Sequence, residues 1–146
     1  MSGSAGYEFV DAVTSDLSFV ARGDSLDETF RAAADAVLAA TVENPEDVAP
    51  RVRRRIALEE PDRELLLLRF LNELVYLRDA EGLLLRAAHV EVEAGPRCVR
   101  VSAELVGEPL DAGRHRPASD VKAVTAHGLR VTPAARGWEA TVTLDV

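Results

Sequence analysis

Apolar residues recur at every second position in some parts of this chain and at every third or fourth position in others. Alternation is the period of a β-strand, and the longer spacing is the period of an amphipathic helix. The alternating parts predict strands at 7–22, 51–59, 83–94, 97–108, 120–132 and 137–146. A polar kink between Asp11 and Asp16 divides the first of them in two. The helical spacing predicts helices at 25–42 and 62–79.

Both predicted helices carry start or stop signals. Ser25 followed by Glu28 forms a capping box, in which the hydroxyl and the carboxylate bind free amides at the helix start. Pro61 and Asp62 open the second helix, and Gly82 ends it. The second helix is apolar around most of its circumference, which predicts that it is the more deeply buried of the two.

The order of these elements is strands, helix, strand, helix and then a run of strands. This order predicts an α+β fold in which two α-helices cover one side of a mostly antiparallel β-sheet. A chain of 146 residues is long enough to bury the core of a single domain. We expect a flexible N-terminus at 1–6 and one folded domain at 7–146.

Composition narrows the function classes. The formal net charge of −8 repels phosphate backbones, so stable direct binding to nucleic acid is not expected. No apolar run is long enough to cross a membrane, and we expect neither a membrane segment nor a secretory leader. The single Cys98 has no partner for an internal disulfide, which favours a cytoplasmic, reducing location.

Three patterns that invite catalytic or binding roles have simpler explanations. GDSL at 23–26 resembles the nucleophile block of an esterase family, but the matching Asp-x-x-His block is missing and a helix cap accounts for the serine. The arginines of RVRRR at 51–55 either contact RNA or an acidic protein, or protect a solvated edge strand. His89, His115 and His127 lack the short spacing of zinc ligands, so we expect hydrogen-bonded roles for them.

Carboxylates form the remaining candidate site. Asp16 lies at the kink of the first strand pair, and Asp145 precedes the terminal carboxylate of Val146. Three hard oxygen donors suit Ca²⁺ or Mg²⁺, which prefer oxygen to imidazole or thiolate ligands. An aspartate near a chain end is more often simply solvated, and sequence spacing alone leaves both interpretations open.

Several motifs, taken in order, match one known pattern. YEFVDAVTSD is similar to an opening strand with an Asp-His-Thr-Ala-Asp signature, GDSLDETFRAAADAV to a first helix, and ELLLLRFLNELVYLRDAEGLLL to a long Leu-rich helix. GEPLDAGRHRPASDVKAVTAHGLRV has Gly-Glu-x-hydrophobic-Asp, a His, Val-Lys-Ala-hydrophobic-Thr and a second His. The chain closes on LDV, where the pattern closes on Asp-Ile or Asp-Val. Together these motifs resemble the archease family over nearly the whole chain.

The resemblance implies a non-catalytic accessory protein of RtcB-type RNA-splicing ligases. Such a protein would promote guanylylation of the ligase and restore its multiple turnover in tRNA splicing or RNA repair. GTP and Mn²⁺ would belong to the ligase and not to this chain. The family's metal site maps onto Asp16, Asp145 and the carboxylate of Val146, with Ca²⁺ as the ion or Mg²⁺ in its place. The rival interpretation is a metal-independent, chaperone-like or structural interaction module.

The chain departs from the family pattern at the signature histidine. Between Asp11 and Thr14 it has Ala12 and Val13, which is one residue more than the pattern and supplies no imidazole. An extra residue here can displace the loop that carries Asp16. The effect on metal binding and on ligase activation does not follow from the sequence.

Four further residues are predicted to support the site: Asp11, Lys122, His115 and His127. Lys122 is the only lysine in the chain, and we expect its compact ammonium charge to pair with carboxylates of the acidic site. The two histidines are expected to act as hydrogen-bonding scaffolds.

Overall fold

The structure is a computed structural model that describes residues 5–13 and 15–146. The described residues form, in chain order, β1 (Gly6–Val13), β2 (Asp16–Gly23), α1 (Leu26–Thr41), the 3₁₀ helix η1 (Pro45–Asp47), β3 (Val52–Glu60), α2 (Arg63–Glu81), β4 (Leu83–Ala94), β5 (Val99–Pro109), β6 (Ala123–Pro133) and β7 (Trp138–Asp145). The predicted α+β class and both predicted helices are confirmed. Of the predicted flexible N-terminus at 1–6, residues 1–4 lie outside the described residues, and Gly6 already belongs to β1.

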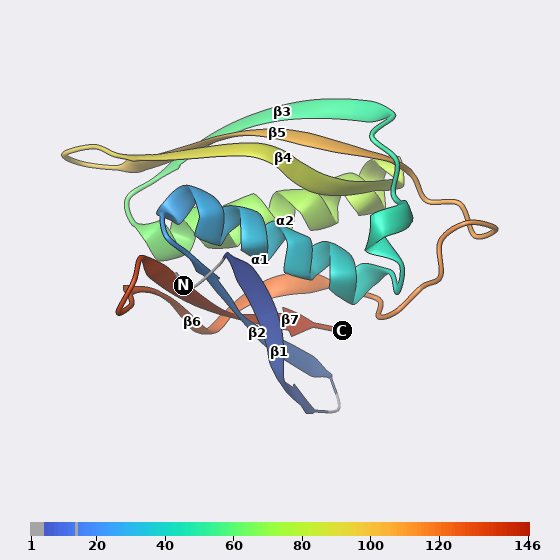
Figure 1. Ribbon diagram of the computed structural model, residues 1–146, viewed down its shortest axis with the longest axis horizontal. Coiled ribbons are helices and arrows are strands. Elements are labelled where there is room, and N and C mark those ends of the chain that lie inside the picture. Colours follow the sequence, from blue (N-terminus) through green and yellow to red (C-terminus); the bar gives the residue numbers. More distant parts are fainter. Residues whose placement is uncertain (1–4, 14) are drawn as a thin grey trace.

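The strands form two antiparallel sheets, where one sheet was expected. One sheet has the order β1-β2-β7-β6 and the other the order β3-β5-β4. Figure 1 shows both helices lying between the two sheets, and each helix contacts strands of both. A helix with apolar residues around most of its surface needs cover on more than one side. The second sheet covers α2, whose buried side chains include Leu67, Phe70 and Leu71. The predicted deeper burial of α2 is nevertheless wrong, because 9 of the 16 residues of α1 are buried but only 7 of the 19 residues of α2, where Leu65 and Tyr76 are exposed.

The predicted helix signals are present in the structure. The Ser25 hydroxyl accepts a hydrogen bond from the Glu28 amide at 3.2 Å, and the Glu28 carboxylate accepts one from the Asp24 amide at 2.9 Å. Asp62 accepts the Leu65 amide in the same way at the start of α2. Gly82 ends α2 in a left-handed conformation with a φ of 69°, which glycine adopts without a steric cost.

The segment from 110 to 122 connects β5 to β6 and closes the carboxyl end of α1. Val42 and Pro117 form an isolated β-bridge, and the amide of Ala118 donates to the carbonyl of Thr41 at 3.0 Å. These contacts bind carbonyl groups that a helix end otherwise leaves unpaired. The strand predicted at 120–132 accordingly begins later, at Ala123.

Gly107 in β5 lies so close to the backbone of β4 that the three-stranded sheet leaves no room for a side chain there. A Cβ atom at this position would overlap the carbonyl oxygen of Leu84 in β4. Gly107→Ala should therefore force the two strands apart and lower the free energy of unfolding by about 1–3 kcal/mol, as other overpacked sites do. Urea denaturation measures the change. Gly6→Ala is the control, since nothing among the described residues lies within 4 Å of the added methyl group, and equal stability of the two variants would contradict this packing.

Candidate functional site

The strand register brings two of the three predicted metal ligands, Asp16 and Asp145, to opposite positions. β2 and β7 pair antiparallel, with Asp16 directly opposite Asp145. Residues paired in this way project from the same face of the sheet, with Cβ atoms about 4.5–5.5 Å apart. The amide of Val146 donates to the carbonyl of Ser15 at 3.0 Å. The end of the chain is therefore held beside the turn that precedes Asp16.

These carboxylates lie on the outer face of the four-stranded sheet. Leu17 and Leu144, the neighbouring residues in each strand, also pair with each other and pack into the core beneath the helices. Because side chains alternate along a strand, Asp16 and Asp145 point away from the helices. Beside them on the outer face, the hydroxyls of Ser18 and Thr143 are hydrogen-bonded at 3.0 Å. The outer face at this end of the sheet is therefore polar and rich in oxygen atoms.

Asp11 reaches the same outer face through a β-bulge. The register between β1 and β2 shifts between Phe9 and Asp11, so that Val10 has no partner and Asp11 lies opposite Ser18. Without the shift, Val10 would face Ser18 and Asp11 would turn toward the helices. The strand that lacks the signature histidine thus still contributes a further carboxylate to this surface. Thr14 of the same signature lies outside the described residues.

The chemistry of these donors fits a hard divalent cation. Two aspartate carboxylates and the terminal carboxylate of Val146 are the oxygen ligands that Ca²⁺ and Mg²⁺ prefer. In residues 5–13 and 15–146, no three His, Cys, Asp or Glu side chains are grouped as a metal site. Asp16 and Asp145 alone do not form such a group, and the predicted third ligand, the carboxylate of Val146, belongs to the chain terminus and not to a side chain of these types.

Lys122 borders this surface through its backbone. Its amide donates to the carbonyl of Asp145 at 2.8 Å, just before β6 begins. Its side chain is exposed and takes part in none of the ion pairs between described residues. The structure therefore places Lys122 next to the site but does not show the predicted pairing of its ammonium group with carboxylates.

His115 lies apart from this surface and has a structural role. It is 1% exposed, and its Nε2 lies 2.9 Å from a carboxylate oxygen of Glu108. The amide of Asp111 donates to its Nδ1 at 2.9 Å. Because Nδ1 is an acceptor, we assign the ring proton to Nε2, which donates it to Glu108. The predicted scaffold role agrees with this geometry.

His127 lies in an irregular part of β6. The register between β6 and β7 shifts between Thr125 and Arg130, and Gly128 has a φ of 67° within this interval. The amide of His127 bonds the hydroxyl of Thr125 at 3.3 Å, while the residue itself is exposed. Its backbone shapes the irregularity, and no hydrogen bond from its imidazole to another described residue is present.

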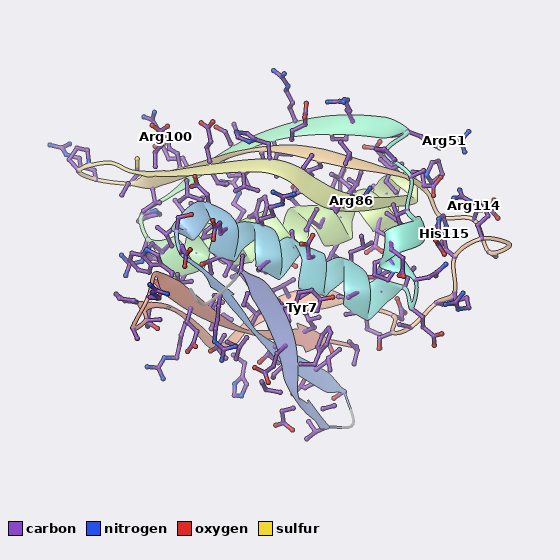
Figure 2. All side chains as sticks on the ribbon, in the orientation of Figure 1. Tyr7, Arg51, Arg86, Arg100, Arg114 and His115 are labelled. Atoms are coloured by element: carbon purple, nitrogen blue, oxygen red, sulfur yellow. The ribbon has the colours of Figure 1, made fainter. Side chains whose placement is uncertain are left out.

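Glu108 is a buried charged residue that sequence reasoning missed. It is 1% exposed and accepts hydrogen bonds from Arg114 at 2.6 Å and from the Ala49 amide at 2.9 Å, besides its contact with His115. The Arg114 bond and then the Ala49 amide are the main causes that lower the pKa of the Glu108 carboxyl from 4.5 to about 2. Figure 2 shows His115 and Arg114 close together at one end of the molecule, with Arg51 nearby. The available signal was the position of Glu108 in the GEPLD motif, a few residues before His115.

The esterase interpretation does not agree with the structure. The oxygen of Ser25 caps the start of α1, while His115 lies beside the loop that closes the other end. These ends are about 24 Å apart for a helix of 16 residues, so the two side chains do not meet. In addition, Nε2 of His115 is already hydrogen-bonded to the Glu108 carboxylate, so it is not available to activate a serine.

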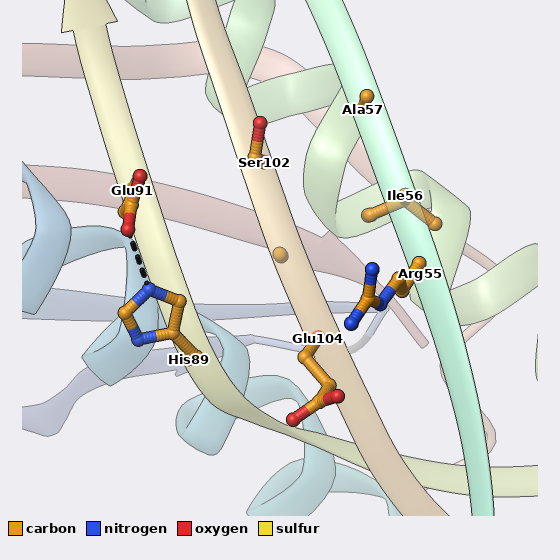
Figure 3. Close-up of a pocket in the computed structure, with 8 residues that line it drawn as sticks. Arg55, Ile56, Ala57, His89, Glu91, Ser102 and Glu104 are labelled. Atoms are coloured by element: carbon orange, nitrogen blue, oxygen red, sulfur yellow. Dashed lines mark hydrogen bonds and ion pairs between the residues drawn. The ribbon is translucent and has the colours of Figure 1, made fainter.

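The outer face of the other sheet carries several polar and charged side chains, many of which are paired with one another. A hollow of about 450 Å³ lies there, lined by residues such as His89, Glu91 and Glu104 (Figure 3). His89 pairs with Glu91 at 2.8 Å, and Arg53 pairs with Glu104 at 3.0 Å. Paired and mostly exposed charges are typical of a solvated sheet face. This face lies across both helices from the carboxylates and contributes nothing to their site.

Neither helix in the described part of the chain combines the length and the apolar content that crossing a bilayer requires.

Glu108→Gln tests the buried network. The folded-state pKa of Glu108 is depressed, so its stabilising effect is complete above pH 4.5 and disappears as the pH falls through about 2. The variant should have a lower urea midpoint than the parent at pH 7, and the difference should shrink as the pH approaches 2. Glu43→Gln removes an exposed pair with Arg116 and should leave the midpoint unchanged. A difference for Glu108→Gln that does not vary with pH would contradict this account.

Comparison with known proteins agrees with the motifs. A model of the Archease protein family matches residues 7–146. Protein archease of Pyrococcus abyssi is 35% identical over 134 residues, covering 91% of this chain and 94% of the relative. Protein archease of Thermococcus gammatolerans is 37% identical over 118 residues, covering 81% and 82%. The solution structure of Methanobacterium thermoautotrophicum protein 1598 superposes with a TM-score of 0.83 at 31% identity, covering 97% of this chain and 99% of that one. The chain therefore belongs to the archease family.

Proposed function

We propose that this protein is a non-catalytic, metal-binding accessory protein of an RtcB-type RNA ligase. The contact surface would be the outer face of the sheet at the end that carries Asp16 and Asp145. The observation that supports this most strongly is their direct pairing in the strand register, with the chain end held beside them. Membership of the archease family agrees with an accessory role.

A bound Ca²⁺, or Mg²⁺ in its place, would supply a positive charge to this acidic surface. Asp16, Asp145 and the carboxylate of Val146 would hold the ion, and Asp11 and Lys122 would border it. The protein itself would keep these oxygens in a fixed arrangement, so that little ordering is needed when the ion binds. GTP and Mn²⁺ would remain with the ligase, whose guanylylation and turnover this contact would promote.

The neighbouring surface suits a protein partner better than RNA. Val10 and Val13 of β1 are 50% and 60% exposed, next to the carboxylates of the outer face. Exposed apolar residues beside charged groups are common in interfaces between proteins, whereas a net charge of −8 opposes phosphate backbones. We place the encounter in the cytoplasm, in keeping with the free thiol of Cys98.

Ligation by an RtcB-type ligase under multiple-turnover conditions, with and without this protein, tests the proposed function. The parent should increase turnover, and Asp145→Ala should lose that effect and bind Ca²⁺ at least about tenfold more weakly in calorimetry. Asp24→Ala, which removes an exposed carboxylate just after the opposite end of β2 from Asp16, is the matched control and should behave like the parent. Unchanged turnover with the parent would overturn the activator role. Activation that persists in Asp145→Ala would favour the metal-independent module.

Val13→Arg tests the docking side of the surface. The substitution places a bulky charge on an exposed position beside Asp16 and should reduce ligase activation by about tenfold, since an interface core excludes unpaired charge. No metal ligand is removed, but the added positive charge beside Asp16 should weaken Ca²⁺ binding, so activation is compared at Ca²⁺ concentrations that saturate each variant. Tyr76→Arg alters a similarly exposed side chain on α2 and should leave activation at the parent level. Equal activation by both variants would contradict a contact at β1.

A further inference from the structure

Polar side chains of α2 hold the backbone on both sides of Lys122. The Asn72 amide group makes two hydrogen bonds to Val124: its Nδ2 donates to the carbonyl at 3.0 Å, and its Oδ1 accepts from the amide at 2.9 Å. A guanidinium nitrogen of Arg78 donates to the carbonyl of Val121 at 2.5 Å. Lys122 and Ala123 therefore lie between two residues whose backbone is bound to the same helix.

The held segment is connected directly to the acidic surface. Ala123 pairs with Asp145 in the ladder between β6 and β7, and Val124 pairs with Leu144. The amide of Lys122 donates to the carbonyl of Asp145 at 2.8 Å. The contacts thus run from Asn72 and Arg78, through 121–124, to the residue that lies opposite Asp16.

Burial makes these contacts rigid. Val121 is fully buried and Val124 is 4% exposed, while the Arg78 side chain is 15% exposed. Hydrogen bonds shielded from water are electrostatically stronger, and breaking them leaves polar groups unsatisfied. The guanidinium of Arg78 also lies 3.6 Å from the carboxylate of Asp120, which adds a second contact to the same segment.

Protection of a sheet edge explains only part of this arrangement. β6 is an edge strand, and side chains that bind its free backbone groups prevent pairing with other chains. Glu64 has such a role at the far end, where it accepts the Val131 amide at 3.0 Å. Glu64 binds one backbone group there, whereas Asn72 and Arg78 together bind three within four consecutive residues, at the end that adjoins Asp145.

We propose that Asn72 and Arg78 are positioning residues for the acidic surface. By fixing 121–124 they limit fraying of β6 from β7 at Asp145, where the ladder ends, and keep the Lys122 backbone at the border of the site. This inference rests on the proposed function of that surface as a cation site. Outer contacts of this kind affect metal affinity because they fix the orientation of the ligands before the ion arrives.

Asn72→Ala and Glu64→Ala form a matched pair, since each removes side-chain bonds from α2 to β6, at opposite ends of the strand. Amide hydrogen exchange and Ca²⁺ calorimetry are measured on both variants of the full chain. Asn72→Ala should speed exchange of the Lys122 amide and weaken Ca²⁺ binding by about tenfold or more. Glu64→Ala should speed exchange only near Val131 and keep parent affinity. Parent-like Lys122 exchange and affinity in Asn72→Ala, or an equal loss in both variants, would overturn the proposal.

Arg78→Lys provides a second test if Asn72→Ala does not fold. It keeps a positive charge near Asp120 but shortens the reach to the Val121 carbonyl, so faster Lys122 exchange and weaker Ca²⁺ binding are expected, and parent values would count against the proposal.

The two readouts, amide exchange and Ca²⁺ affinity, also distinguish failure of this proposal from failure of the proposed function. If the parent binds no Ca²⁺, the metal part of the proposed function fails, and Lys122 exchange alone decides the positioning role: faster exchange in Asn72→Ala supports it and unchanged exchange refutes it.

Discussion

The antiparallel pairing of β2 with β7 is the interaction on which the rest of the functional surface depends. Phe19 lies opposite Val142, and both are fully buried against the helices. A slip of one residue would turn these side chains to water and Asp16 toward the core, which the hydrophobic effect opposes strongly. Burial on the inner face therefore determines where the carboxylates lie on the outer face. The positions of the candidate ligands follow from packing and do not require a bound ion.

Much of the local structure could be predicted because its causes are local. The alternation in 138–144 and the capping residues Ser25 and Asp62 act over a few residues, and the corresponding strand and helices are present. The division into two sheets could not be predicted, because alternation shows that a strand has two faces but does not identify its partner. The motifs predicted that Asp16 and Asp145 belong to one site. That both side chains project from the same face of the sheet follows only from the strand register, which the sequence does not specify.

Features that depend on long-range contacts were missed. The bulge at Val10 decides which face Asp11 occupies, and no residue type marks it. In the sequence, Glu108 is one glutamate among several in a predicted strand. Its role follows from the loop after β5, which places Arg114 and His115 against its carboxylate. The value of Asn72 as a backbone clamp likewise depends on where β6 lies relative to α2. In each case the sequence supplies the group, and tertiary structure supplies its partner.

The missing signature histidine leaves oxygen atoms as the candidate metal-binding groups near Asp16. Without the signature imidazole, the groups paired around Asp16 and Asp145 are carboxylates and hydroxyls, the donor types that suit Ca²⁺ or Mg²⁺ better than softer metals. A crystal structure of the protein with Ca²⁺, using anomalous scattering to locate the ion, tests this account most directly. It predicts one ion bound by Asp16, Asp145 and the carboxylate of Val146, with oxygen distances of about 2.3–2.6 Å. An ion bound elsewhere, or none at saturating Ca²⁺, would contradict it.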